Sequence, residues 1–478
     1  MRTFTTNWKR KSIHVLFASV IALGTMLSWQ PVAYGQSAPA ASMDAQNKTI
    51  SGSTSNQFTE EWHQWIKNNA YALESILPEQ TKNGLIASDR FKDLDMLKPL
   101  LSDKRIVYLG ESSHGVGEFN SVKARLIQFL HQELGFNVVA FESPLGNAAT
   151  AFGSAKTSTA NQLMKKSVFP QWWAKETTPL FQYIQESQST DNPIQLTGFD
   201  MQSLGPFLNG EVLKDQDLAK RLAETEKKLF QWGNTEDLAA YSAIKPDLQK
   251  LYKDVKGKIA TNENQLKKMY PDNPHIVAMV NRTLDDRLRV VDEYIELSIK
   301  ANVAAQAGDY AVMTKMMEWR DKAMADNLLW LATEIYPMEK IIVWGHNAHI
   351  SKAESKMEQS FMPVAGRFMG EIMQDSIFGP YSYTIGLYAG SGTTHDNMGE
   401  PLAIQPLPAS SIESIMKAAN RPYSFVDLRY AMKGSGTSWM DEPRTALYFG
   451  LLPEVFVPRE QYDGILYIDK VQPPTTTN

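Results

Sequence analysis

The sequence predicts an α/β fold in which a mainly parallel central sheet is flanked by helices and carries an all-helical insertion. Short apolar runs of strand length alternate with amphipathic helical stretches, a pattern typical of βαβ units. Several of these runs are apolar throughout, as strands are when helices cover both faces of a parallel sheet. The expected strands are Arg105–Leu109, Phe136–Phe141, Ile194–Phe199, Lys340–Trp344, Tyr381–Tyr388, Ser424–Leu428 and Gly464–Ile468.

Helical periodicity indicates which segments lie between and before these strands. The expected helices are Glu60–Glu74, Glu118–Glu133 and Trp172–Ser187. The second of them places Phe119, Val122 and Leu126 at helical spacing, so one of its faces is buried.

The chain is expected to divide into a discontinuous α/β core and one insertion. Residues 57–212 form the first part of the core and residues 306–471 the second part. Residues 213–305 are rich in Lys, Glu, Asp and Gln and contain no strand pattern, so they form a helical insertion. An insertion over the sheet edge would serve as a lid or substrate wall, or as a purely structural extension; the sequence leaves both open.

The N-terminal region has the pattern of a secretory signal. The positive residues Lys9–Lys11 precede the apolar stretch Val15–Leu27, which is too short to span a bilayer comfortably, and small residues follow it. We therefore expect a signal peptide over 1–35, with an uncleaved anchor as the alternative. Residues 36–56, rich in Ser, Ala, Thr and Asn, are expected to form a disordered linker, and residues 472–478 a flexible tail.

Composition excludes several classes of site. The 478 residues carry a formal net charge of −5 and no basic block in the body of the chain, so nucleic acid is not an expected partner. The chain has no cysteine, which excludes disulfides, thiolate zinc sites, a cysteine nucleophile and a lipoprotein anchor. No later stretch is long and apolar enough to cross a membrane, so we expect an exported protein without a stable membrane anchor after signal cleavage.

Ionisable side chains follow three of the predicted strands. Glu111 and His114 lie in a glycine-flanked turn after the first strand, and Glu142 follows the second. His346 and His349 come directly after the Lys340–Trp344 strand. Since open α/β sheets bind ligands at the carboxyl ends of their strands, this arrangement predicts an enzyme.

These residue types fit acid–base chemistry, and two readings of the histidine pair remain open. A neutral His114 can take a proton from water near pH 7, with Glu111 orienting it or sharing the proton. Glu142, at the end of an apolar strand, is either exposed at the sheet edge or partly buried with a raised pKa that suits acid–base work. His346 and His349 can bind zinc together with one of these groups, or they can stabilise an oxyanion and transfer a proton.

A serine nucleophile is not predicted. The turn Gly110–His114 begins like the nucleophile elbow Gly-x-Ser-x-Gly, but a histidine stands where the second glycine belongs. That glycine permits close packing of strand and helix, so the match fails.

Three further residues are candidates for substrate binding. Arg320 lies on one helical stripe with Met313, Met317, Met324, Leu328 and Leu331, so it faces the interior. A buried guanidinium needs a carboxylate or a ligand, and Asp200 and Asp321 are its candidate partners. His395, after the Tyr381–Tyr388 strand, can line the same sheet edge.

The ordered set of short motifs resembles the erythromycin esterase family. The motifs are Gly-Glu-Ser-Ser-His-Gly at 110–115 with Glu118-Phe119, Ala140-Phe141-Glu142, Gly198-Phe199-Asp200, Arg320-Asp321 with Met324-Ala325, and Trp344-x-His346-Asn347-x-His349. The late segment Tyr462–Ile468 also looks like the family's final strand. The likeness covers nearly all of the chain after the linker.

The resemblance implies an α/β core with a helical insertion and the hydrolysis of a macrolide lactone or a related ester. Water attacks directly in this family, without an acyl-enzyme, and antibiotic resistance is the associated role. The histidine matching His114 is the general base. The glutamates matching Glu111 and Glu142, and the histidines matching His346 and His349, line the site.

We therefore expect a secreted hydrolase that cleaves a small-molecule carboxylic ester or macrolide lactone and needs no cofactor. Its catalytic residues would be His114, Glu111, Glu142, His346 and His349, and its substrate-binding residues Arg320, Asp200 and His395. The first alternative is a metal-dependent hydrolase that uses the His346/His349 cluster. The second is a non-catalytic extracellular protein that binds an amphiphilic ligand.

Overall fold

A computed structural model describes residues 52–81, 86–359 and 365–477. The predicted signal peptide 1–35 and most of the predicted linker 36–56 lie outside the described residues. The linker was predicted to extend too far, because helix α2 (Gly52–Asn69) already begins at Gly52. Trp62 and Ile66 of this helix are buried and anchor it on the core, so the polar residues before them continue the helix.

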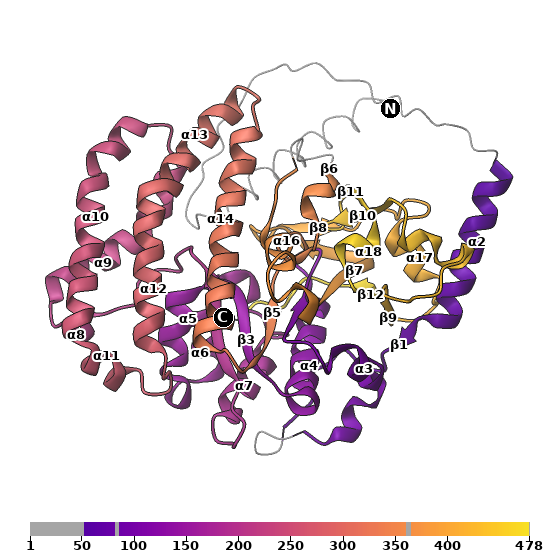
Figure 1. Cartoon of the computed structure of the whole chain (residues 1–478), viewed down its shortest axis with the longest axis horizontal. Helices are drawn as coiled ribbons and strands as arrows, with labels where there is room; N and C mark the ends of the chain where they lie inside the picture. The colour runs from indigo at the N-terminus through magenta and orange to yellow at the C-terminus, as the bar shows by residue number, and fades with distance from the viewer. Residues whose placement is uncertain (1–51, 82–85, 360–364, 478) are drawn as a thin grey trace.

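A large mixed sheet forms the centre of the molecule (Figure 1). Its strands, in the described residues, are β1 (Tyr71–Ala72), β2 (Ile106–Leu109), β3 (Phe136–Pro144), β4 (Gln195–Asp200), β5 (Lys340–Trp344), β7 (Ser382–His395), β8 (Pro401–Ala403), β9 (Tyr423–Asp427) and β12 (Gly464–Val471). All seven predicted strands are among them, within a few residues of their expected bounds, except that β7 continues to His395.

The sheet is mainly parallel, as its strand order and the direction of each strand pair show. The order is β1-β9-β12-β7-β2-β5-β3-β4, and every neighbouring pair from β12 to β4 is parallel. Strands β1 and β9 extend one edge in antiparallel fashion, and β8 pairs with the end of β7. Strands β2, β5, β3 and β4 are therefore direct neighbours, and the predicted fold class is confirmed.

Helices cover both faces of the sheet. Successive strand residues point to opposite faces, and the residues on both faces are buried. Val107 and Leu109 pack into one hydrophobic cluster, whereas Ile106 and Tyr108 pack into the other. Helices in the two core segments are α3 (Lys98–Leu101), α4 (Gly117–Leu134), α5 (Leu145–Phe152), α6 (Ala160–Ser167), α7 (Thr178–Ser187), α15 (Asn347–Ile350), α16 (Met369–Gln374), α17 (Ile412–Lys417) and α18 (Pro458–Gln461).

The region between β4 and β5 contains helices and no strand, and the predicted insertion 213–305 lies within it. These helices stand together on one side of the sheet in Figure 1. They are α8 (Gly210–Leu213), α9 (Gln216–Lys228), α10 (Leu238–Thr261), α11 (Glu263–Met269), α12 (Ile276–Arg289), α13 (Ile295–Gln306) and α14 (Ala311–Trp330).

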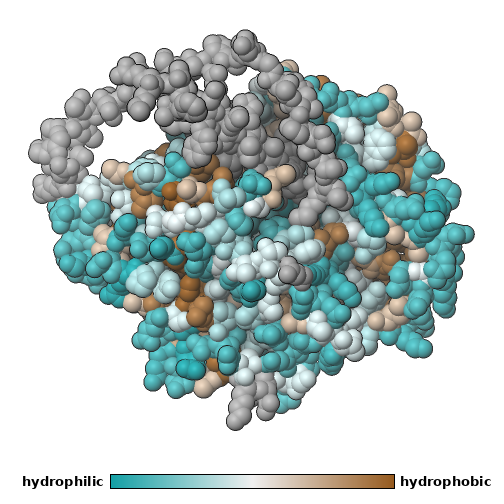
Figure 2. Space-filling view, turned by 180° about the vertical axis from the view of Figure 1, so that it is seen from behind, coloured by the Kyte–Doolittle hydropathy of each residue, from teal (hydrophilic) through white to brown (hydrophobic). Residues whose placement is uncertain are grey.

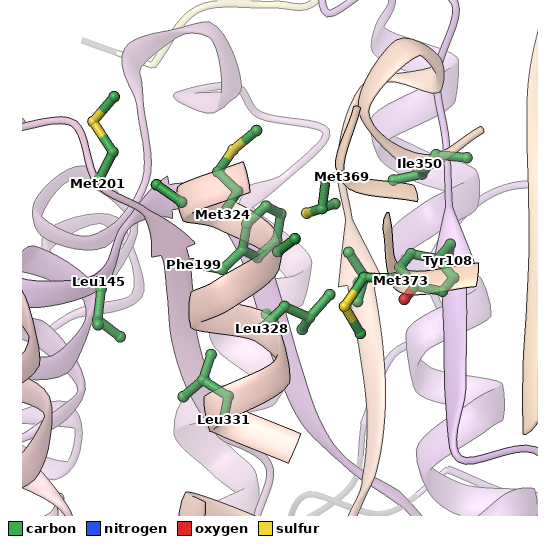
Figure 3. Packing of buried hydrophobic residues seen from close by; sticks show 14 of the residues in the cluster. Tyr108, Leu145, Phe199, Met201, Met324, Leu328, Leu331, Ile350, Met369 and Met373 are labelled. Atoms are coloured by element: carbon green, nitrogen blue, oxygen red, sulfur yellow. The ribbon is translucent and has the colours of Figure 1, made fainter. Parts of the chain in front are cut away.

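Helix α14 connects the insertion to the sheet. Figure 3 shows Met324 and Leu328 of this helix beside Phe199 of β4, and all three are completely buried. Arg320, one turn earlier on the same face, is also buried. The helical stripe that predicted an inward-facing arginine is therefore confirmed.

The surface is mostly polar. Figure 2 shows a face dominated by hydrophilic residues, with hydrophobic residues in separate groups. None of the helices in the described ranges combines the length and apolar character that a membrane span requires.

Two features of the second core segment differ from expectation. A small antiparallel sheet, β10-β11-β6, was not predicted; its strands are β6 (Glu358–Gln359), β10 (Arg444–Tyr448) and β11 (Leu452–Phe456). The predicted flexible tail 472–478 is wrong for residues 472–477. Their backbone groups pair with other segments, as in the bonds from the Gly117 amide to the Gln472 carbonyl and from the Thr477 amide to the Trp173 carbonyl.

Candidate active site

The carboxyl ends of four neighbouring strands carry the candidate residues. Glu111 and His114 follow β2, and His346 follows β5. Glu142 lies near the end of β3, next to a register shift between Phe141 and Pro144, and Asp200 ends β4. Because β2, β5, β3 and β4 are adjacent, the sheet brings these side chains to one edge.

His114 and Glu111 form a buried pair. His114 Nδ1 lies 2.6 Å from Glu111 Oε1, and the two side chains are 3% and 0% exposed. The His114 Nε2 atom makes no hydrogen bond within the described part of the chain. Gly115 is required beside them, since a Cβ there would lie 2.2 Å from the His395 carbonyl oxygen.

Two further donors hold Glu111 in place. Lys123 Nζ lies 2.5 Å from Oε2, and Trp172 Nε1 donates to Oε1 at 3.1 Å. The lysine is fully buried on the inner face of α4 and lies 4.1 Å from the centre of a Trp344 ring. Burial lowers the pKa of Lys123 to about 8, although Glu111 opposes this change.

Lys123 was not among the predicted site residues, although its spacing on the helix indicates a buried position. Phe119, Lys123, Leu126 and Leu130 fall on one helical stripe, so the lysine interrupts an apolar face as Arg320 does on α14.

Glu142 accepts hydrogen bonds from three elements. Arg320 Nη2 donates to Oε1 at 3.1 Å, and His349 Nε2 lies 3.2 Å from the same oxygen. The His346 backbone amide donates to Oε2 at 2.9 Å. Burial raises the pKa of this carboxyl, but the opposing effects of the His349 and His114 imidazoles and of Arg320 are together larger, so the pKa of Glu142 lies well below its usual value.

The expectation of a raised pKa at Glu142 is therefore wrong. Burial alone favours the neutral acid, but the site supplies cations and donors that favour the carboxylate. Glu142 is a permanent anion at the centre of the cluster.

His346 lies between the His114–Glu111 pair and the group around Glu142. Its ring centre lies 5.0 Å from that of His114, and its backbone amide binds Glu142. Its Nδ1 accepts the Ala348 amide proton and caps α15, so the neutral ring carries its proton on Nε2. Burial, followed by the influence of the neighbouring His114 imidazole, holds the pKa of His346 well below its usual value.

His349 is a buried cation. Nδ1 lies 2.7 Å from Asp321 Oδ1, and Nε2 faces Glu142. Burial lowers the pKa of this imidazole, but Asp321 and Glu142 outweigh it and raise the pKa to about 10. Asp321 thus pairs with His349, while Asp200 is the carboxylate that binds Arg320, with Oδ2 2.5 Å from Nη2. Of the two candidate partners of Arg320, only Asp200 contacts it directly.

Two aromatic residues cover His346 and were not found from the sequence. Phe449 stacks on its ring at 5.4 Å and Tyr448 contacts it at 5.0 Å. Phe449 has φ = 53°, a conformation rare for a bulky residue, and its amide donates to the Ser112 carbonyl at 2.8 Å. Gly450 follows with φ = 68°, so the tight turn between β10 and β11 requires this conformation.

A pocket opens at His114. His395 lines it together with His114 and Trp173, and the His395 amide donates to the Gly115 carbonyl at 3.0 Å. His395 thus lies on the His114 side of the site, apart from the cluster of Arg320 and Asp200. The structure brings together Glu111, His114, Glu142, His346, His349, Arg320 and Asp200 as a connected network.

The histidine pair does not converge on one point. His349 directs both ring nitrogens at carboxylates, whereas Nδ1 of His346 accepts a backbone amide proton. Among residues 52–81, 86–359 and 365–477, no group of three His, Asp or Glu side chains has the arrangement of a metal site.

Known proteins similar to this chain identify its family. The erythromycin esterase family profile matches residues 131–471. The protein named "Putative hydrolase YbfO" of Bacillus subtilis (strain 168) is 34% identical over 423 residues, which are 86% of this chain and 91% of that one. Erythromycin esterase type II of Escherichia coli is 23% identical over 395 residues, covering 77% of this chain and 89% of that protein.

Solved structures share the fold. A crystal structure titled as a succinoglycan biosynthesis protein matches 89% of this chain and all of that chain (100%), with a TM-score of 0.62 and 18% identity. An erythromycin esterase EreC mutant in its open conformation matches 84% of this chain and 98% of that chain, with a TM-score of 0.54 and 16% identity. By the profile match over residues 131–471 and the 34% identity to the Bacillus subtilis protein, this chain belongs to the erythromycin esterase family, a family of hydrolases.

Proposed function

We propose that this protein hydrolyses a carboxylic ester or a lactone, a macrolide lactone among the candidates, by direct attack of water. The observation that carries the proposal is the buried His114–Glu111 pair beside a pocket. Nδ1 of the imidazole donates to the carboxylate, so the lone pair of Nε2 is available to a water molecule on the pocket side. Glu111 fixes the tautomer and stabilises the imidazolium that forms.

The proton balance requires no covalent intermediate. His114 takes one proton from water as the oxygen attacks the carbonyl carbon and a tetrahedral oxyanion forms. Collapse of this intermediate breaks the bond to the leaving alkoxide, which receives the proton back from His114. An acid and an alcohol, or a ring-opened hydroxy acid, are the products.

His346 is the proposed oxyanion donor. Its proton resides on Nε2, which is buried; the Ser112 backbone lies close to this imidazole but forms no hydrogen bond of good geometry with Nε2. A preorganised donor of this kind stabilises developing negative charge without reorganisation. Its low pKa keeps the ring neutral, so it donates its proton in a hydrogen bond without carrying a charge of its own.

The remaining cluster positions His346. Glu142 holds the backbone amide of His346, and Arg320 and His349 hold Glu142. In this proposal Glu142, His349, Arg320 and Asp200 act mainly through position and charge, while His395 contacts substrate from the pocket wall.

The serines of the turn do not match a nucleophile. Ser113 Oγ lies 2.7 Å from Thr394 Oγ1 and accepts the Gly115 amide proton. In the described residues neither Ser112 nor Ser113 has its hydroxyl bonded to an imidazole, which is what activates a serine.

We also propose that the protein is exported, on the basis of the signal-like residues 1–35. The N-terminal mass of the protein recovered outside the producing cell tests this: export with cleavage leaves a chain that begins near residue 36, whereas an intact N-terminus in the cell fraction contradicts it.

Mass spectrometry of reaction products tests the chemistry. The protein, freed of metals with a chelator, is incubated with erythromycin and with simpler esters and lactones. A gain of one water mass on any of them supports metal-free hydrolysis. Activity that returns only with added zinc or manganese supports the metal-dependent alternative. Saturable binding without any product supports the binding-protein alternative.

A further inference from the structure

Residues 472–477, the tail segment, run in extended form beside the candidate active site. The Gly117 amide donates to the Gln472 carbonyl at 2.9 Å, and the Lys175 amide donates to the Thr475 carbonyl at 2.8 Å. The Thr477 amide in turn donates to the Trp173 carbonyl at 3.0 Å. Backbone pairing of this kind fixes the segment, because it joins the segment to the buried Gly117, the half-buried Trp173 and the exposed Lys175 of the core.

Two carboxylates hold the tail segment from either side. The Gln472 amide donates to Glu118 Oε2 at 2.9 Å, and the Thr475 amide donates to Glu176 Oε2 at 2.9 Å. Amide–carboxylate hydrogen bonds are charge-assisted and are among the stronger ones in proteins. The tail segment thus joins the start of α4 to the loop after Trp172, and Trp172 binds Glu111.

The tail segment also forms part of the pocket. Pro474 and Thr476 line the cavity that His114 and His395 line from the other elements. The cavity has a volume of about 190 Å³. An enclosed apolar cavity of about 150 Å³ holds benzene, so the space beside His114 holds a group of about one ring, and because the pocket is partly open the rest of a larger substrate would lie outside it.

We propose that the tail segment is a specificity element: it walls the pocket at His114 and restricts the ester group bound there to about the size of one six-membered ring. This inference rests on the proposed ester hydrolysis for its substrate class. The wall itself is a matter of geometry and can be tested without turnover.

A matched pair of variants tests the wall. In an extended segment neighbouring side chains point to opposite sides. Both Thr475 and Thr476 are exposed, but only Thr476 lines the pocket. Thr476→Trp should fill the cavity, and Thr475→Trp is the control of equal size. A chain that ends at Val471 removes the wall.

The first readout is the rate at which diethyl pyrocarbonate modifies His114, measured by mass spectrometry of the peptide that contains it. Because modification requires access to the imidazole, we expect a rate roughly fivefold or more above that of the parent for the chain ending at Val471. For Thr476→Trp we expect a rate roughly threefold or more below that of the parent, and for Thr475→Trp a rate within about 1.5-fold of the parent. Equal rates in all four proteins would overturn the proposal. Thr476→Trp decides it if the shortened chain does not fold.

The second readout is selectivity in two ester series, in which either the acyl or the alcohol group grows from methyl through benzyl to naphthylmethyl. In one of the two series, kcat/KM of the parent should fall by roughly tenfold or more between the benzyl and the naphthylmethyl ester. A misfit of one methylene group already changes kcat/KM by about this factor. The shortened chain should lose this fall, and Thr476→Trp should move it to smaller groups. Unchanged selectivity in both variants would contradict the proposal. If the parent cleaves no ester, the proposed function fails, and the modification rates still decide whether the wall exists.

Discussion

Glu111→Gln tests how the site orients and charges its base. The substitution keeps the size of the side chain and one oxygen acceptor for His114 and Trp172. It removes the negative charge that lies between the imidazole and the Lys123 ammonium. Effects on activity and on stability can therefore be separated.

The expected loss of activity follows from the distance. At 2.6 Å and an effective dielectric constant of about 20, a carboxylate stabilises an imidazolium by about 6 kcal/mol. Lys123, at 2.5 Å from the other carboxylate oxygen, offsets part of this, and we take about 4 kcal/mol as the remainder. This predicts a fall in kcat of roughly 10³-fold, because each 1.36 kcal/mol corresponds to a factor of about ten.

The loss of stability has a different origin and a different pH dependence. Breaking a buried ion pair costs about 3–5 kcal/mol, because Lys123 is left without its partner. The pKa of Lys123, about 8 in the parent, falls further without Glu111. The deficit of the variant is then largest in acid and shrinks as the pH rises through about 8, since above that pH the lysine is neutral in the parent as well.

The assay measures kcat and KM on the ester that proves to be cleaved, with thermal unfolding recorded from pH 6 to 9. The double variant Glu111→Gln/Lys123→Met should recover stability and remain inactive, because no buried charge is left unpaired. Activity of Glu111→Gln within threefold of the parent would refute the assigned role of the carboxylate.

Three further predictions concern the surroundings of the base. The pKa of His349 in the folded protein is raised to about 10, so its stabilising contribution is complete below about pH 6.5 and is lost as the pH rises toward 10. Asp321→Asn should lower the free energy of unfolding by about 3–5 kcal/mol at pH 7 and make the loss of stability at alkaline pH smaller. An unchanged pH dependence of thermal unfolding would count against the His349–Asp321 pair. Phe449→Ala should destabilise the protein by about 3–5 kcal/mol and lower kcat, because His346 loses its stacked ring; parental values in chemical denaturation would contradict this. His395→Ala should raise KM several-fold with kcat within about twofold, the signature of uniform binding, and a lower kcat at unchanged KM would assign it a different role.

The position of the site could be predicted because it depends on periodic elements. Glu111, Glu142 and His346 follow apolar strands, and parallel strands end at the same edge of a sheet. Arg320 could be placed in the interior from its spacing on α14, and Asp200 could be named with Asp321 as a candidate partner, but the sequence did not decide between them.

The other parts of the site depend on tertiary contacts that leave no local pattern. Phe449 lies in a turn between two short strands. Its role in the site depends on the His346 ring on which it stacks and not on its neighbours in the chain. The tail segment has no apolar periodicity and was expected to be flexible, but its backbone pairs with distant segments. The pKa of Glu142 was expected to rise, because the sequence shows burial but does not show how many cations converge on one carboxylate.

The most direct test of the central claim is kcat/KM for His114→Asn on the ester that the parent cleaves, with circular dichroism and thermal unfolding to verify the fold. Asparagine can still bond to Glu111 but cannot accept a proton from water. The account predicts a fall of at least roughly 10²–10⁴-fold, the usual contribution of a positioned base, with the fold intact. Activity within threefold of the parent would contradict the assignment of His114 as the base.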